Sequence, residues 1–151
     1  MSRQKKRTGK QILLRFLFLV YAAAMFWLLF GQRWGTDAHL QKTAGAINLT
    51  PLVTIKLYWR ILKYSQNRAL LIHAFVNLVG NVLMFIPLGF YIPYLMKGTR
   101  KFFKSTLLVL CLILAIEAVQ HVTYLGSCDV DDVILNFAGA TMGYLFWRIK
   151  Y

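Results

Sequence analysis

Runs of apolar residues long enough to cross a membrane limit this chain to a small set of folds. Three of them, at about residues 11–31, 69–92 and 105–125, approach or exceed the roughly 20 residues that a spanning helix needs. A shorter fourth run covers about residues 132–148. Because backbone groups in hydrocarbon must be hydrogen-bonded within their own segment, these runs predict helices.

Composition supports a membrane environment. The chain has 151 residues, is 58% hydrophobic and has a mean hydropathy of +0.53, which is more apolar than a soluble domain of this size. We therefore predict an all-α integral membrane protein, a four-transmembrane-helix bundle that forms one domain over residues 1–151. In the second run, Pro87 and Pro93 predict a kink or an early end near the sequence IPLG.

The positions of Lys and Arg predict the orientation in the membrane. Five lie in residues 1–10, four in 97–104 and two in 148–150, whereas the loop near 126–132 has none and is acidic. The positive-inside rule then places both termini in the cytoplasm of a multi-pass protein of a cell membrane, which we expect to be bacterial. The net charge of +13 lies in the gaps between apolar runs, a pattern that favours anionic lipids and disfavours nucleic-acid binding.

The region 32–68 should lie outside, yet it holds six Lys and Arg residues. Within it, about residues 51–65 predict a helix with Thr50 as N-cap and Pro51 at the first helical position. Lys56, Arg60 and Lys63 fall in one stripe of this helix, and apolar residues cover the rest. The pattern predicts an outer-face amphipathic interfacial helix, although a loop helix packed on the bundle fits equally well.

Polar residues in the apolar runs form stripes at helical spacing, and four of the five acids lie within residues 116–136. The predicted orientation brings every stripe to the outer leaflet, where polar groups should face protein or water. We therefore expect one polar pocket that opens outward. Its expected binding residues are Asn77, Asn81, Glu117, Gln120, Asp129, Asp132 and Asn136.

Other roles for these residues stay open. Glu117 and His121 are candidates for general acid/base catalysis, or for a hydrogen-bonded pair. Carboxylates favour Mg²⁺ or Mn²⁺, so the metal candidates are Asp129, Asp131 and Asp132, although no cofactor is expected. Asparagines can also bond between helices, and Asp131 or Asp132 can cap the fourth helix, in which Gly139 and Gly143 would allow close helix approach.

Four motifs in order resemble VanZ-like membrane proteins, from about residue 10 to the end. They are INLTPLVTI at 47–55, NLVGNVLMFIPLGF at 77–90, IEAVQ at 116–120 and CDVDDVILNFAGATMGY at 128–144. Two departures are Leu52, where the family usually has Phe, and YLGS, where many relatives carry Arg. The resemblance implies an association with teicoplanin resistance that leaves precursor synthesis unchanged.

Three functions follow as hypotheses. The pocket could bind a lipid-linked cell-envelope head group or the lipoglycopeptide itself and shield it. The chain could instead be an intramembrane enzyme acting on a lipid or cell-wall precursor, or a small proton-coupled transporter in which Glu117 titrates. Membrane lipids are the expected partners, and the sequence indicates no oligomeric state.

Overall fold

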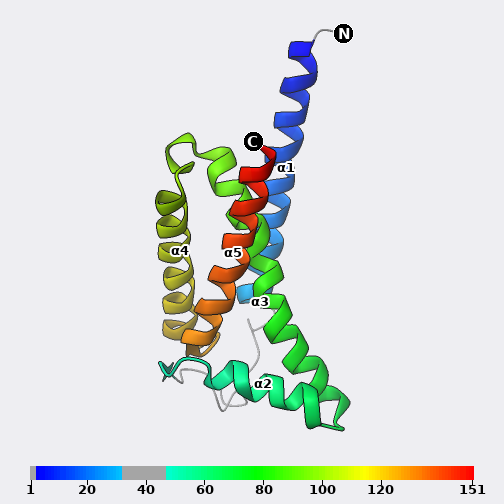
Figure 1. The fold of residues 1–151 in the computed structure, drawn as a ribbon, viewed down its shortest axis with the longest axis vertical. Helices are drawn as coiled ribbons and strands as arrows, with labels where there is room; N and C mark the ends of the chain where they lie inside the picture. The colour runs from blue at the N-terminus through cyan, green and yellow to red at the C-terminus, as the bar shows by residue number, and fades with distance from the viewer. Residues whose placement is uncertain (1–2, 32–46) are drawn as a thin grey trace. The chain divides into compact units, whose positions relative to one another are not determined.

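The computed structural model describes residues 3–31 and 47–151 and confirms an all-helical protein (Figure 1). Helix α1 (Arg3–Phe30) belongs to one compact unit, residues 1–36, and the other elements belong to a second, residues 37–151. The helices of the second unit are α2 (Val53–Tyr64), α3 (Arg68–Leu95), η3 (Lys97–Thr99), α4 (Phe102–Val122) and α5 (Val130–Lys150). Two short strands, β1 (Ile47–Asn48) and β2 (Cys128–Asp129), complete it.

Three helices are long and apolar enough to cross a membrane: Gln11–Phe30 of α1, all of α3 and all of α4. They indicate a multi-pass membrane protein. Helix α5 has 21 residues, or about 31 Å at 1.5 Å per residue, which is also a spanning length. However, its first turn holds two acids and its last turn two bases, so the four-span prediction is not confirmed.

Of the kink or early end predicted near IPLG, the early end is wrong, and the kink stays a prediction. Helix α3 continues through Pro87 and Pro93 to Leu95. Proline is tolerated inside apolar helices when neighbouring groups satisfy the freed carbonyls. The carbonyls that Pro87 and Pro93 leave without a helical partner are those of Leu83 and Gly89. The helix itself ends with the hydroxyl of Thr99, which donates to the carbonyl oxygens of Ile92, at 3.2 Å, and Met96, at 2.8 Å. With 28 residues, α3 is about 42 Å long, more than the hydrocarbon core requires.

The main packing contact of the second unit is between α3 and α5, whose backbones touch at three glycines. A Cβ added to Gly139 would overlap the carbonyl of Val82, and one on Gly143 would overlap the carbonyl of Ile86. Gly89 of α3 lies in the same way against the backbone of α5. The sequence-based prediction that Gly139 and Gly143 allow close helix approach is therefore confirmed, as small residues four apart do in other membrane helices.

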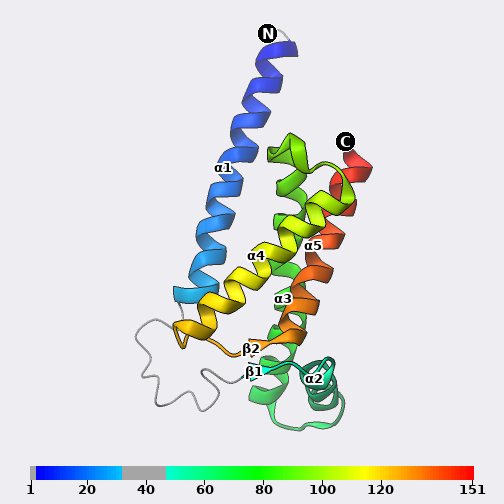
Figure 2. The same ribbon diagram turned by 90° about the vertical axis from the view of Figure 1, so that its left-hand side faces the viewer.

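Helix α4 packs on α5 in the opposite direction, after a short loop (Figure 2). A shallow cleft between them is lined by Ser105 and Val109 of α4 and by Ala140 and Tyr144 of α5, among others. The Tyr144 hydroxyl donates to the carbonyl oxygen of Arg100 at 2.9 Å. These contacts between α4 and α5, and the bond of Tyr144 to Arg100, fix the register of the two helices.

Substitution of Gly143 by alanine should destabilise the bundle, because the new methyl group would displace the α3 backbone. Overpacking of this kind costs about 1–3 kcal/mol. Gly80→Ala is the matched control, since a Cβ there meets only a side-chain atom of Val76 at 3.8 Å. Thermal unfolding in detergent should show a lower Tm for Gly143→Ala than for Gly80→Ala. Equal Tm values would contradict the backbone contact.

Candidate functional site

The polar residues gather at one end of the second unit, where α4 ends and α5 begins. Figure 2 shows β1 and β2 side by side there, next to α2. The strands pair in parallel, with Ile47 opposite Cys128 and Asn48 opposite Asp129. This short pairing brings the segment that leads into α2 against the acidic loop.

The carboxylate of Asp131 holds the N-terminus of α2. Asp131 has no exposed surface, and its oxygens accept backbone N–H groups from Leu52 at 2.5 Å, Thr54 at 2.7 Å and Ile55 at 3.0 Å. The first N–H groups of a helix have no partner inside the helix and carry its positive dipole end. Asp131 supplies both the hydrogen-bond acceptors and the negative charge, although it lies more than 70 residues away in the sequence.

The predicted start of this helix is therefore wrong. Helix α2 begins at Val53, and its N-cap residue is Leu52, with a left-handed φ of 66° and no side-chain cap. Thr50 and Pro51 lie before that, and the N–H of Thr50 donates to Oδ1 of Asn48 at 3.2 Å. Local sequence contains no sign of a cap supplied by a distant aspartate. The local pattern typical of a helix start is Thr50 followed by Pro51.

Asp129 has a related structural role. It is the N-cap of α5, and its Oδ1 accepts the N–H of Asp131 at 2.9 Å and the side-chain amide of Asn48 at 3.1 Å. Its Oδ2 accepts the hydroxyl of Thr54 at 2.6 Å. The expectation that Asp131 or Asp132 caps this helix is wrong, because the cap lies immediately before the helix, at Asp129.

These hydrogen bonds bear on the metal candidates. Among the described residues, no group of three or more His, Cys, Asp or Glu side chains is arranged to hold a metal ion. N–H and O–H donors point at both oxygens of Asp129 and of Asp131, where a cation would meet positive hydrogens. Asp132 is engaged elsewhere, since its Oδ1 accepts the side-chain amide of Asn81 at 2.6 Å.

The polar residues His73, Asn77 and Asn81 on one face of α3 have different surroundings. Asn81 joins the acidic end through its bond to Asp132. Farther toward the start of α3, the side-chain amide of Asn77 donates to the carbonyl of His73 at 2.9 Å, within its own helix. The His73 ring packs edge-on against Tyr58 of α2, with centroids 5.7 Å apart. The structure therefore brings Asn81 into the polar end, while Asn77 and His73 lie beside α2.

Glu117 of α4 lies in the same region. Glu117 is 4% exposed and Gln120 is 8% exposed. Because Val109 lines the same cleft as Ala140, two further turns of these antiparallel helices place Glu117 level with Asp132.

The thiol of Cys128, in the loop between α4 and α5, also indicates that Glu117 lies near this end. Burial raises the pKa of the Cys128 thiol, and the negative charges of Glu117 and Asp129 raise it further.

Polar atoms at this end are buried without a hydrogen bond to a described residue, among them Oδ1 of Asn136 and Nδ1 of His121. The side chain of Asn136 is 3% exposed, and His121 lies one turn beyond Glu117. A buried polar group in this condition costs about 1–3 kcal/mol. We define the polar cluster as the residues of this end that do not anchor α2: Asn81, Glu117, Gln120, His121, Asp132 and Asn136.

Two residues were missed from the sequence. Asn48 and Thr54 both donate to Asp129 and so connect β1, α2 and α5. Asn48 also donates to the hydroxyl oxygen of Thr54 at 3.1 Å. Both lie in the stretch INLTPLVTI, one of the four motifs on which the resemblance was based, and that was the signal that could have identified them.

The fold and the site define a multi-pass membrane protein with a buried polar cluster at one end of its helices. The VanZ/LLP1 family model matches residues 17–151, so the chain belongs to this family. A curated relative is Protein VanZ of Enterococcus faecium, which is 27% identical over 141 residues, 93% of this chain and 76% of the relative. No solved structure matches the chain significantly.

Substitution of Asp131 by asparagine should release the start of α2. Asparagine keeps one acceptor oxygen but turns an NH₂ donor toward backbone N–H groups, and loss of a bond to a charged acceptor costs about 1.5–3 kcal/mol. Hydrogen exchange at the amides of Leu52, Thr54 and Ile55 should become faster, with little change at the centre of α3. Thr50→Ala removes the cap expected from sequence and should leave these amides protected. Equal exchange in both variants would exclude the anchoring role.

Proposed function

We propose that the chain crosses the membrane four times, through α1, α3, α4 and α5, with both termini in the cytoplasm. The basic residues support this orientation, since residues 97–104 and 148–150 lie at the end of the bundle opposite the acidic loop. The spanning length of α5 supports the fourth crossing. Helix α2 then lies on the outer surface, as an interfacial helix. It runs crosswise to α5 at the end of the bundle, and none of its residues is buried (Figure 1).

Labelling of the two cysteines tests this topology. A membrane-impermeant maleimide should label Cys128 from outside intact cells and leave Cys111, on the exposed side of α4, unlabelled. Only the thiolate reacts, and the pKa of Cys128 is raised above its ordinary 9.0. Labelling should therefore be slow at neutral pH and accelerate as the pH approaches and passes 9.0. Cys128→Ser is the control, and labelling of Cys128 only after lysis would reverse the orientation.

We further propose that the polar cluster binds the polar head group of a lipid-linked cell-envelope molecule or of a lipoglycopeptide, and that expression lowers teicoplanin susceptibility without altering precursor synthesis. The observation that carries this proposal is the burial of Asn136, whose side-chain oxygen has no hydrogen bond to a described residue, at the end of the bundle where Glu117 is also buried. Donors on a ligand would satisfy that oxygen. Membership of a family that includes Protein VanZ supports the drug class.

The relation of the cluster to α2 supports a lipid-linked ligand. Asp129 and Asp131 hold the helix beside the cluster through five hydrogen bonds to Asn48, Leu52, Thr54 and Ile55. If α2 lies at the interface, the cluster lies at the depth where head groups are found. A ligand with an apolar tail could then keep the tail in the bilayer while its head group enters the polar end of the bundle.

Expression of the chain in a susceptible host should raise the teicoplanin concentration needed for inhibition more than the vancomycin concentration. Glu117→Gln, Asp132→Asn and Asn136→Ala should each return teicoplanin susceptibility to that of cells without the protein, at unchanged abundance. Glu117→Gln is the sharpest test, since it keeps the shape and removes only the charge and proton exchange.

Asn77→Ala is the matched control for Asn136→Ala, because the Asn77 amide bonds within its own helix, and it should keep most of the protection. Full protection in Glu117→Gln would exclude a charged role for this residue. An equal change for both drugs would indicate a general effect on the envelope instead.

A further inference from the structure

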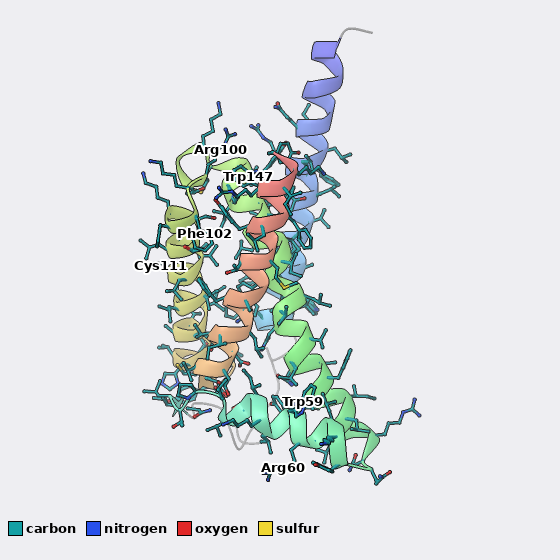
Figure 3. All side chains as sticks on the ribbon, in the orientation of Figure 1. Trp59, Arg60, Arg100, Phe102, Cys111 and Trp147 are labelled. Atoms are coloured by element: carbon teal, nitrogen blue, oxygen red, sulfur yellow. The ribbon has the colours of Figure 1, made fainter. Side chains whose placement is uncertain are left out.

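Helix α2 has two different faces. The half-buried residues lie on one face, and they are Thr54, Ile55, Tyr58, Ile61 and Leu62. On this face Thr54 donates to Asp129 and the Tyr58 ring packs against His73 of α3. The opposite face is exposed and carries Val53, Lys56, Leu57, Trp59, Arg60, Lys63 and Tyr64. Figure 3 shows Arg60 extending from α2 away from the other helices. The basic stripe is therefore turned outward, and the apolar residues most nearly opposite it pack against the protein.

The outward face combines cations with large apolar side chains. Lys56, Arg60 and Lys63 lie within about 60° of one another around the helix, at 100° per residue. On one side of them is Trp59, 66% exposed, and on the other are Leu57, 52% exposed, and Tyr64, 67% exposed. Such a face, with cations between exposed aromatic and aliphatic groups, is typical of helices that lie among lipid head groups.

Nothing within α2 neutralises this face. The helix has no acidic residue. Among the described residues, Asp129 and Asp131 contact α2, and their oxygens accept N–H and O–H donors at the start of the helix. Basic residues on the outer side of a membrane oppose the positive-inside rule, so three of them on one exposed face require a partner that favours them.

We propose that the outward face of α2 binds the phosphate of an anionic membrane lipid. The inference rests on the proposed position of α2 at the outer surface and adds the chemistry of the lipid beside the polar cluster. Lys56 and Arg60 are one turn apart, about 6 Å along the axis, so both can reach one phosphate, and Lys63 extends the surface by a further turn. A soluble polyanion would satisfy the cations but leave Trp59 and Leu57 in water, whereas a lipid covers both.

The hydrogen bonds to Asp131 fix the position and rotation of the basic face of α2. A helix held only by its apolar face could rotate or slide in the interface. Three backbone hydrogen bonds at its start fix α2 against α5, so the cations are presented at a constant position relative to Glu117 and Asn136. A lipid phosphate held by α2 would place the rest of its head group near the polar cluster.

Fluorescence quenching by brominated lipids tests the proposal. The full-length protein is reconstituted in nanodiscs that mix brominated phosphatidylglycerol with unlabelled phosphatidylcholine, or the reverse, and the signal of Trp59 is obtained by difference from a Trp59→Phe variant. Phosphatidylglycerol should quench Trp59 preferentially, since each cation near the surface increases the partition of an anionic lipid about fivefold. Replacing Lys56, Arg60 and Lys63 together by Gln should abolish the preference.

The matched control replaces Lys97, Arg100 and Lys101 by Gln, which removes the same charge at the opposite end of the bundle and should keep the preference. Equal quenching by both lipids, or a preference that survives the substitutions in α2, would overturn the proposal. So would displacement of the lipid by inorganic phosphate at an ionic strength matched with chloride, because the site would then recognise free phosphate. Glu117→Gln should leave the lipid preference intact, so failure here is distinguishable from failure of the proposed function.

Discussion

The close approach of α3 and α5 is the contact on which the rest of the second unit depends. Glycines at positions 89, 139 and 143 let the two backbones touch, and this contact fixes their relative position along the bundle. The amide of Asn81, next to Val82, then meets the carboxylate of Asp132 at 2.6 Å, about two turns before Gly139 on α5. Since hydrophobic association is weak between helices in lipid, such packing and the polar bonds beside it are what hold the pair together.

The acidic loop divides its carboxylates between structure and site. Asp129 and Asp131 act as internal anions, satisfying the starts of α5 and α2. Burying a carboxylate is expensive unless hydrogen bonds compensate for the lost water, and here several N–H donors do so. Glu117 and Asp132 do not contact α2 in this way, and they belong to the polar cluster with Gln120 and Asn136. The acids therefore serve two purposes although they are neighbours in sequence.

This division gives α2 a defined place in the proposed function. A helix with an apolar inner face and a basic outer face could lie on a membrane without any help. The contacts of Asp131, Asp129 and Asn48 add a fixed orientation. With α2 at the interface, as we propose, the helix and the polar cluster would form one continuous region, with lipid on the exposed side of α2 and hydrogen-bonding groups behind it.

The sequence by itself determined the helical class, the three apolar spans and the location of the polar end, because helical periodicity and hydropathy are local properties. It also identified Gly139 and Gly143 as a contact surface. Only the tertiary structure decided that Asp131 holds the start of α2, that Asp129 caps α5 and that α3 continues past Pro87. Asp129 and Asp131 bond to Asn48, Leu52, Thr54 and Ile55, more than 70 residues away, and local patterns contain no information about such partners. The prolines of α3 favour a local break, and only the folded helix decides against it.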